Sequence, residues 1–227
     1  MLIQLDFSAV LSEWPLLAKG LAWTVSLTAL AALLGVALGV VCAWSRVYGA
    51  RWLRLVVGSY VELIRNTPFI VQLFFIFFGL PAAGVRLSPE VASILAMVIN
   101  LAAYAAEIIR AGIEATPRGQ IMAAKSLGMR PLRVFMSIVL PPALQTVWPA
   151  MTGQIIIVML GSAVCGQIST EELSYAANLI QSRNFRAFES FIIAALIYLA
   201  LAMVLRKALS SAGSRLIFGR SQDAVRT

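Results

Sequence analysis

Residues 107–144 read EIIRAGIEATPRGQIMAAKSLGMRPLRVFMSIVLPPAL, and they separate two strongly apolar parts of the chain. This stretch is basic, because it carries Arg118, Lys125, Arg130 and Arg133. A basic, partly helical loop between two membrane spans belongs on the cytoplasmic side of the membrane. The stretch therefore predicts both a break between two spans and the orientation of the chain around it.

A short helix is predicted inside this loop, over residues 119–127. Thr116 and Pro117 form a helix-start signal, because the Thr side chain can cap a free N–H and Pro needs no N–H there. Gly128 supplies a left-handed end, and Arg130 avoids helical geometry because a Pro follows it. This helix carries the small residues Ala123 and Ala124, which let the backbone of another protein come close. An ordinary basic loop is the alternative from local chemistry alone.

Composition makes the chain an integral membrane protein. Of its 227 residues, 60% are hydrophobic and 12% are charged, and the mean hydropathy is +0.88. A soluble domain of this size does not need so much apolar surface. We expect one domain over residues 1–227, because no polar segment exceeds about forty residues and a separate nucleotide-binding module has no room.

Charge sets the predicted topology of this all-α protein. Residues 1–15 contain acidic side chains but no Lys or Arg, which places the N-terminus outside and argues against a cleaved signal peptide. Thirteen Lys/Arg and two acidic residues then lie inside, including the C-terminal tail, whereas four basic and six acidic residues lie outside. This asymmetry explains the net charge of +8 without a nucleic-acid partner. Five transmembrane helices are predicted, at residues 21–44, 55–80, 90–111, 143–165 and 188–205.

The residue types exclude several kinds of chemistry. There is no His, so imidazole catalysis and His metal sites are absent. Cys42 and Cys165 lie in apolar runs and are expected to pack as small hydrophobes, without a disulfide. No phosphate-binding Gly-rich loop and no nucleophile with a base occurs, so we expect neither catalytic residues nor a bound metal or cofactor.

Two features of the first spans concern packing. Gly35 and Gly39 form a Gly-x-x-x-Gly pair that permits close helix crossing. In the second span, Pro68 frees a backbone carbonyl that must find a partner in lipid. Glu62 and Arg65 are one helical turn apart, so they are expected to pair, with a snorkelling pair near the cytoplasmic surface as the plainer reading.

Polar residues within the spans mark a candidate substrate path. Asn100, Tyr104 and Glu107 share one face of the third span. A carboxylate in hydrocarbon is costly and normally faces a bundle interior or a water cavity. The alternative places Glu107 at the cytoplasmic interface, paired with Arg110 or another basic residue of a loop. The fourth span adds Gln154, for which an interhelical hydrogen bond is the plainer role. The candidates for the path are Asn100, Tyr104, Glu107, Gln72 and Gln154.

The outer polar segment between the last two spans contains a capping-box pattern. Residues 169–172 read STEE, which predicts a helix from there to about residue 180. This helix offers a polar surface to a partner, although a merely solvated helix is the plainer explanation.

From Gly119 onward the loop resembles the "EAA" loop of ATP-binding-cassette (ABC) transporter permeases. One residue departs from that motif: Met122 stands where the motif has Glu. The motif positions that match are Ala123, Ala124, Gly128, Ile138, Leu140 and Pro141. Three further stretches resemble the polar amino-acid branch (histidine, glutamine and arginine type), namely residues 138–144, residues 64–72 with Asn66 in place of a Gly, and the Asn100, Tyr104 and Glu107 pattern.

This resemblance implies the permease subunit of an importer in the cytoplasmic (inner) membrane. It implies a cytoplasmic coupling helix between spans three and four, in the loop 112–137. A dimer of ABC ATPase subunits, carrying ATP and Mg²⁺, would hold that helix. The other implied partners are a second permease subunit, identical or paralogous, a periplasmic or extracellular solute-binding protein, and a polar amino acid or close relative as cargo. The implied coupling residues are Thr116, Pro117, Gly119, Met122, Ala123, Ala124, Gly128 and Arg130.

Two other classes of function compete with this one. An ion-coupled secondary carrier would use Glu107 and Arg65, but such folds usually have internal repeats with broken helices in matching halves, and five unlike spans offer none. A structural membrane subunit without a path would not explain why Asn100, Tyr104 and Glu107 share a face.

Overall fold

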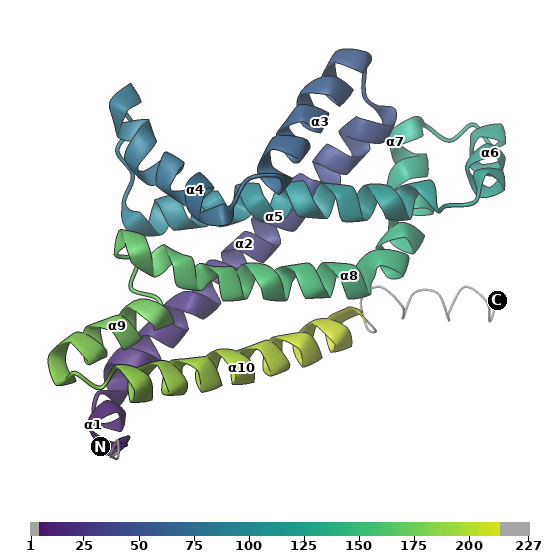
Figure 1. Cartoon of the computed structure of the whole chain (residues 1–227). Helices are drawn as coiled ribbons and strands as arrows, with labels where there is room; N and C mark the ends of the chain where they lie inside the picture. The colour runs from purple at the N-terminus through teal and green to yellow at the C-terminus, as the bar shows by residue number, and fades with distance from the viewer. Residues whose placement is uncertain (1–4, 214–227) are drawn as a thin grey trace.

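The computed structural model describes residues 5–213, and every regular element in that range is helical. Figure 1 shows three long helices running side by side, with α2 (Trp14–Tyr48) crossing them obliquely. The three are α5 (Pro89–Glu114), α8 (Leu140–Gly161) and α10 (Ala187–Ala212). At opposite ends of this bundle lie α9 (Leu173–Asn184) and α6 (Arg118–Ser126).

Shorter elements connect these helices. In chain order they are α1 (Ser8–Leu11), α3 (Arg51–Arg65), α4 (Phe69–Phe74), the π-helix η1 (Phe75–Gly79), the 3₁₀-helix η2 (Leu80–Ala83), α7 (Pro131–Val134), the π-helix η3 (Phe135–Val139) and the 3₁₀-helix η4 (Ser162–Ile168).

The described residues contain four helical segments that are long and apolar enough to cross a membrane: Trp14–Tyr48, Pro89–Glu114, Pro131–Ile168 and Ala187–Ala212. A fifth candidate is the pair Arg51–Arg65 and Phe69–Ala83, which is bent by 110° at the break between its arms. Counting this pair as one span gives the predicted five, and the helix breaker predicted at Pro68 divides this span into two helices. Pro68 has no N–H to continue the helix, and the chain changes direction there.

The first and last spans are longer than expected. The predicted bounds 21–44 and 188–205 become Trp14–Tyr48 and Ala187–Ala212, because hydropathy marks only the most apolar core of each helix. Pro15 is tolerated in the first turn of α2, where its missing N–H costs nothing. The basic residues Arg206 and Lys207 fall within α10. Arg215, Arg220 and Arg226 of the basic tail lie outside the described residues.

The fourth span begins well before the expected residue 143. It runs without a break from Pro131 to Ile168, through Pro141 and Pro142. The π-helix η3 comes just before these prolines. Its wider turn accommodates backbone groups that an α-helix would leave unpaired, so the two prolines do not end the span.

Small residues let α2 and α5 pack closely, as the Gly-x-x-x-Gly pair predicted. A Cβ built on Gly39 would lie 2.6 Å from the Cβ of Ala105, and one on Gly35 would lie 3.0 Å from the Cβ of Leu101. Real Cβ atoms essentially never come within 3.0 Å of another atom, so a side chain at Gly39 would force the helices apart. A side chain at Gly35 would require Leu101 to shift. The packing role of Gly35 and Gly39 is therefore confirmed.

A buried carboxylate organises the end of the bundle that carries α9. The capping box expected from Ser169 is wrong, because Glu172 itself caps α9 by accepting the backbone N–H groups of Ser174 and Tyr175 at 2.9 and 2.8 Å. The hydroxyl of Tyr198 on α10 also donates to Glu172, at 2.5 Å. The Glu172 side chain is fully buried, and this burial raises its pKa above the ordinary carboxyl value.

Candidate functional site

The break in the second span is held together by one amide side chain. Beyond Pro68, the Nε2 of Gln72 donates to the carbonyl oxygens of Ile64 at 2.7 Å and Thr67 at 3.0 Å. The hydroxyl of Thr67 donates to the carbonyl of Leu63 at 2.9 Å. These bonds supply partners for the carbonyl groups that the break releases, as a membrane environment requires.

The same amide joins the break to the third span. Asn100 donates from Nδ2 to Oε1 of Gln72 at 3.0 Å, and both side chains are buried. Asn100 also lines a cavity of about 90 Å³, together with Phe69, Ile157, Val158 and Gly161. Two of the predicted path residues are thus in direct contact beside a small, partly open cavity. Gln154 is buried in α8, and no hydrogen bond within the described chain connects it to Gln72 or Asn100.

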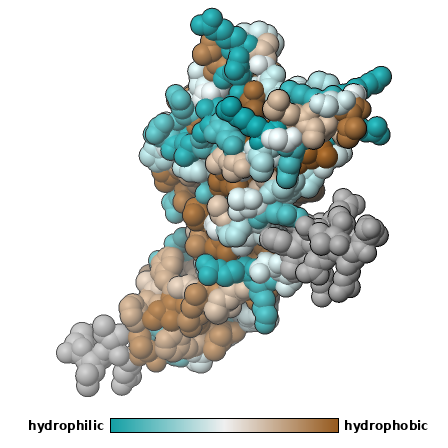
Figure 2. All heavy atoms as spheres, turned by 90° about the vertical axis from the view of Figure 1, so that its right-hand side faces the viewer, coloured by the Kyte–Doolittle hydropathy of each residue, from teal (hydrophilic) through white to brown (hydrophobic). Residues whose placement is uncertain are grey.

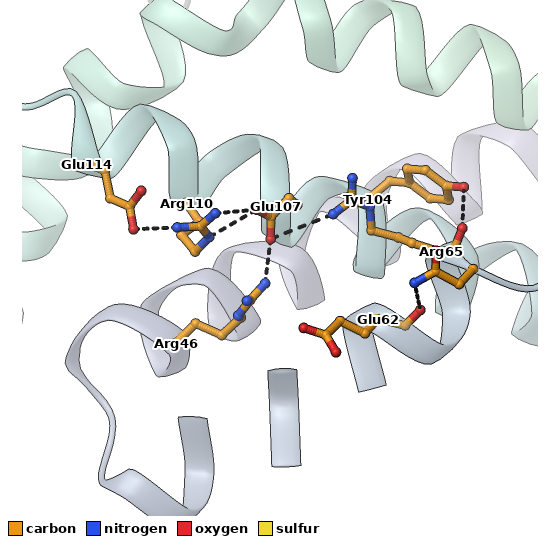
Figure 3. A network of polar contacts seen from close by, with 8 residues as sticks. Arg46, Glu62, Arg65, Tyr104, Glu107, Arg110 and Glu114 are labelled. Atoms are coloured by element: carbon orange, nitrogen blue, oxygen red, sulfur yellow. Dashed lines mark hydrogen bonds and ion pairs between the residues drawn. The ribbon is translucent and has the colours of Figure 1, made fainter. Parts of the chain in front are cut away.

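Tyr104 continues the polar face of α5 toward the end of α3. Its hydroxyl donates to the carbonyl oxygen of Arg65 at 3.4 Å. The guanidinium of Arg65 lies 5.6 Å from the centre of the Tyr104 ring, within range of a cation–π interaction. The shared face predicted for Asn100, Tyr104 and Glu107 is therefore real, because all three side chains contact residues of the broken span. Figure 3 shows this for Tyr104 and Glu107.

Glu107 is the centre of an ion-pair cluster (Figure 3). Its Oε2 pairs with Arg46 and, at 3.8 Å, with Arg65, while its Oε1 pairs with Arg110. Arg110 continues the cluster to Glu114 at 2.5 Å. The alternative that pairs Glu107 with Arg110 is confirmed. The expected pair between Glu62 and Arg65 is wrong among the ion pairs of the described residues, because Arg65 turns to α5 instead.

Sequence reasoning missed Arg46 as a member of this cluster. It lies near the C-terminal end of α2, 61 residues before Glu107. The sequence alone indicates only a basic residue in the loop after the first span. Helix crossing brings it close, and no local pattern signals such a distant pair.

The loop between the third and fourth spans holds the predicted short helix, with altered ends. α6 covers Arg118–Ser126, and its N-cap is Pro117 without a side-chain cap. The capping role expected of Thr116 is wrong, because its hydroxyl donates back to the carbonyl of Gly112 at 3.4 Å. Gly128 adopts the expected left-handed conformation, with φ of +73°.

The surface of α6 is only partly as expected. Ala123 is exposed, but Ala124 is buried against the bundle, so only one of the two alanines is open to a partner. Met122 is 68% exposed and Leu127 is 82% exposed. Beside the helix lies an open hollow of about 700 Å³, lined by Leu127, Gly128, Met129, Arg130, Leu132, Arg133, Met136 and Ser137. Hydrophilic side chains gather on this end of the molecule (Figure 2).

Comparison with known proteins gives matches over most of the chain. Residues 35–210 match the family described as binding-protein-dependent transport system inner membrane component. The L-cystine transport system permease protein TcyB of Bacillus subtilis is 36% identical over 195 residues, covering 86% of this chain and 83% of that protein. The arginine transport system permease protein ArtQ of the same organism is 32% identical over 204 residues, covering 89% and 93%.

Solved structures agree with these relatives. A crystal structure of an amino acid ABC transporter with histidines contains a chain that is 37% identical, with a TM-score of 0.84, and the match covers 94% of this chain and all of that one. An inward-facing MetNI methionine ABC transporter is 23% identical with a TM-score of 0.70, which supports the shared fold.

Proposed function

The chain belongs to the family of inner membrane components of binding-protein-dependent transport systems, and we propose that it carries a polar amino acid. It is a permease subunit of an ABC importer and a multi-pass protein of the inner membrane. The cargo proposal rests on its relatives: the printed names of TcyB and ArtQ specify L-cystine and arginine, and the structure with a TM-score of 0.84 is an amino acid transporter.

The work for transport comes from outside the chain. We expect a separate ATPase dimer, carrying ATP and Mg²⁺, to bind α6 on the cytoplasmic side. Three observations support α6 as the coupling element. It lies between two spans at one end of the bundle, it exposes Met122 and Ala123, and the left-handed turn at Gly128 fixes its orientation. The proposed contact residues are the exposed Pro117, Gly119, Met122, Ala123, Gly128 and Arg130. The buried Thr116 and Ala124 are proposed to hold the coupling helix against the bundle.

The path for the cargo is proposed along the polar face of α5. Asn100 lines the small, partly open cavity and is bonded to Gln72, and Tyr104 and Glu107 follow toward the α6 end. Gln154 is the proposed contribution of α8. A second permease subunit, identical or similar, would complete the path, and a solute-binding protein would deliver the cargo at the end that carries α9.

The single broken span favours this function over an ion-coupled carrier. Secondary carriers usually place broken helices in matching halves. Among the described residues there is one bent pair of helices and no second pair to match it.

A reconstitution experiment tests the proposal. The chain, its ATPase, its second permease and its binding protein would be placed in proteoliposomes, and the uptake of radiolabelled L-cystine, L-arginine and L-glutamine would be measured. We expect uptake of at least one of these amino acids, dependent on ATP. Uptake by the permease without ATPase, driven by an ion gradient, would contradict the proposal.

A further inference from the structure

The break of the second span carries exposed polar residues and lies level with the middle of α5. Asn100 and Tyr104, which contact the break, are near the middle of α5. Figure 1 shows α3 and α4 as the arms of a V whose vertex meets α5. Arg65, Asn66 and Pro68 at this vertex are exposed. Irregular backbone and charge at membrane depth face protein or a water-filled cavity and not lipid, so this surface is turned toward an aqueous path or a second subunit.

The charges around Glu107 leave one guanidinium weakly bound. Arg46 and Arg110 each make a close pair with a different oxygen of the Glu107 carboxylate. Arg65 approaches only to 3.8 Å, well beyond the roughly 2.7–2.9 Å of a charge-assisted hydrogen bond. Its side chain is also the most exposed of the three, at 40% against 20% for Arg46 and 27% for Arg110. Arg65 therefore keeps hydrogen-bond donors available.

The guanidinium is nevertheless held in place. The ring of Tyr104 lies 5.6 Å from it, and the hydroxyl of Tyr104 is bonded to the backbone of the same arginine. A charged group that is positioned in advance loses less conformational entropy when it binds a ligand. Glu62, one turn earlier on α3, is exposed and forms no ion pair with Arg65 among the described residues.

We propose that Arg65 binds the carboxylate of the transported amino acid. The planar guanidinium matches a carboxylate through two parallel hydrogen bonds. When Arg65 turns to the cargo, Glu107 keeps its close pairs with Arg46 and Arg110, so no isolated carboxylate is left in the bundle. This inference rests on the proposed amino-acid cargo. It adds the recognition of one chemical group that all amino acids share, at a named side chain.

The test compares each amino acid with its α-carboxamide, which lacks the negative charge. The complete permease–ATPase complex would be purified in lipid nanodiscs without the binding protein, so that the selectivity of the binding protein does not interfere. The probes are L-arginine, L-glutamine and L-cystine, with L-argininamide, the α-amide of L-glutamine and cystine diamide as their partners. We expect the wild-type complex to bind the acid about 10- to 100-fold more tightly than the amide.

Variants of two arginines on α3 assign this preference to one side chain. Arg65→Gln is expected to remove the preference, because the affinity for the amino acid should fall to the affinity for its amide. Arg65→Lys is expected to keep part of the preference. Arg54→Gln is the matched control, because Arg54 is an exposed arginine on the same helix, and it should keep the full preference. If Arg65 had a purely structural role, Arg65→Gln would lower the affinities for acid and amide equally. The ratio of the two affinities would then stay unchanged, which would overturn the proposal.

The wild-type measurement keeps the proposal falsifiable even if the Arg65 variants fail to assemble. Equal binding of acid and amide by the wild-type complex would refute the role of Arg65 while leaving the amino-acid cargo intact. Binding of none of the three amino acids, together with no uptake in proteoliposomes, would refute the cargo and with it this inference.

Discussion

The side-chain amide of Asn100 donates to the side-chain oxygen Oε1 of Gln72 at 3.0 Å, and this bond connects the middle of α5 to the broken second span. Gln72 uses its own amide nitrogen for the carbonyls of Ile64 and Thr67. One side chain therefore satisfies the backbone of the break and fixes the break to its neighbour. This arrangement keeps an irregular segment stable at a depth where water is scarce.

Gln72→Ala should destabilise the protein. The substitution leaves the carbonyl of Ile64 and the amide of Asn100 without these partners, and an unsatisfied buried group costs about 1–3 kcal/mol. Thermal unfolding of the purified protein in detergent measures the effect as a lower Tm. Gln120→Ala on the exposed surface of α6 is the control and should leave Tm unchanged. An equal Tm for both variants would show that the bonds of Gln72 contribute nothing.

Gly39→Ala should separate α2 from α5. The new Cβ would meet the Cβ of Ala105 at 2.6 Å, and forcing extra volume into a packed contact costs about 1–3 kcal/mol. Gly153→Ala in α8 is the matched control, since nothing lies within 4 Å of its Cβ position and alanine favours the helix by about 0.5–1 kcal/mol over glycine. The two variants should shift Tm in opposite directions. A stabilised Gly39→Ala variant would refute the packing account.

Gly128→Val should impair assembly with the ATPase. Gly128 has φ of +73°, a conformation that costs a β-branched residue about 1–2 kcal/mol or more. The turn after α6 would then change, and the helix would be presented in another orientation. Copurification of the ATPase with the tagged permease measures the loss, with the amount of permease in the membrane as reference. Gly128→Asn should retain binding, because Asn tolerates left-handed geometry. Full copurification with Gly128→Val would argue against the docking role.

Met122→Glu should be tolerated. Met122 is 68% exposed on α6, and substitutions at such positions usually change stability by less than about 0.5 kcal/mol. The new carboxylate restores the residue that the EAA motif carries at this position, so the ATPase should still copurify. A severe loss of assembly would contradict the placement of α6 in the ATPase interface.

Glu172→Gln should change how stability depends on pH. Burial raises the pKa of Glu172, so the folded protein holds the proton more tightly than the unfolded chain. Such a group makes the wild type less stable as the pH rises from the ordinary carboxyl pKa through the raised one. The variant lacks this loss, so its Tm relative to wild type should increase as the pH rises above the ordinary carboxyl pKa.

Glu171→Gln is the neighbouring control for this pH series. Glu171 is half-buried, with 45% of its side chain exposed, and it pairs with Lys19. The change of relative Tm with pH should be larger for Glu172→Gln than for Glu171→Gln, because only the Glu172 carboxylate is fully buried. An equal change with pH in both variants would mean that burial does not raise the pKa of Glu172.

The sequence determined the helical membrane class, the packing role of Gly35 and Gly39, and the left-handed turn at Gly128. Each of these depends on local chemistry: apolar runs, the lack of a Cβ, or a backbone conformation that favours glycine. The shared face of Asn100, Tyr104 and Glu107 was also predictable, because helical periodicity alone places them together.

The tertiary structure decided which groups meet across that face. Arg46 pairs with Glu107 because α2 crosses α5. Arg65 pairs with Glu107 and not with Glu62, because the second span bends by 110° at the break before α4. The cap of α9 is Glu172 and not the predicted Ser169, because two backbone N–H groups and the hydroxyl of Tyr198 surround the buried Glu172 carboxylate. Helix crossing angles and bends depend on the packing of whole surfaces, so no local sequence pattern encodes these partners.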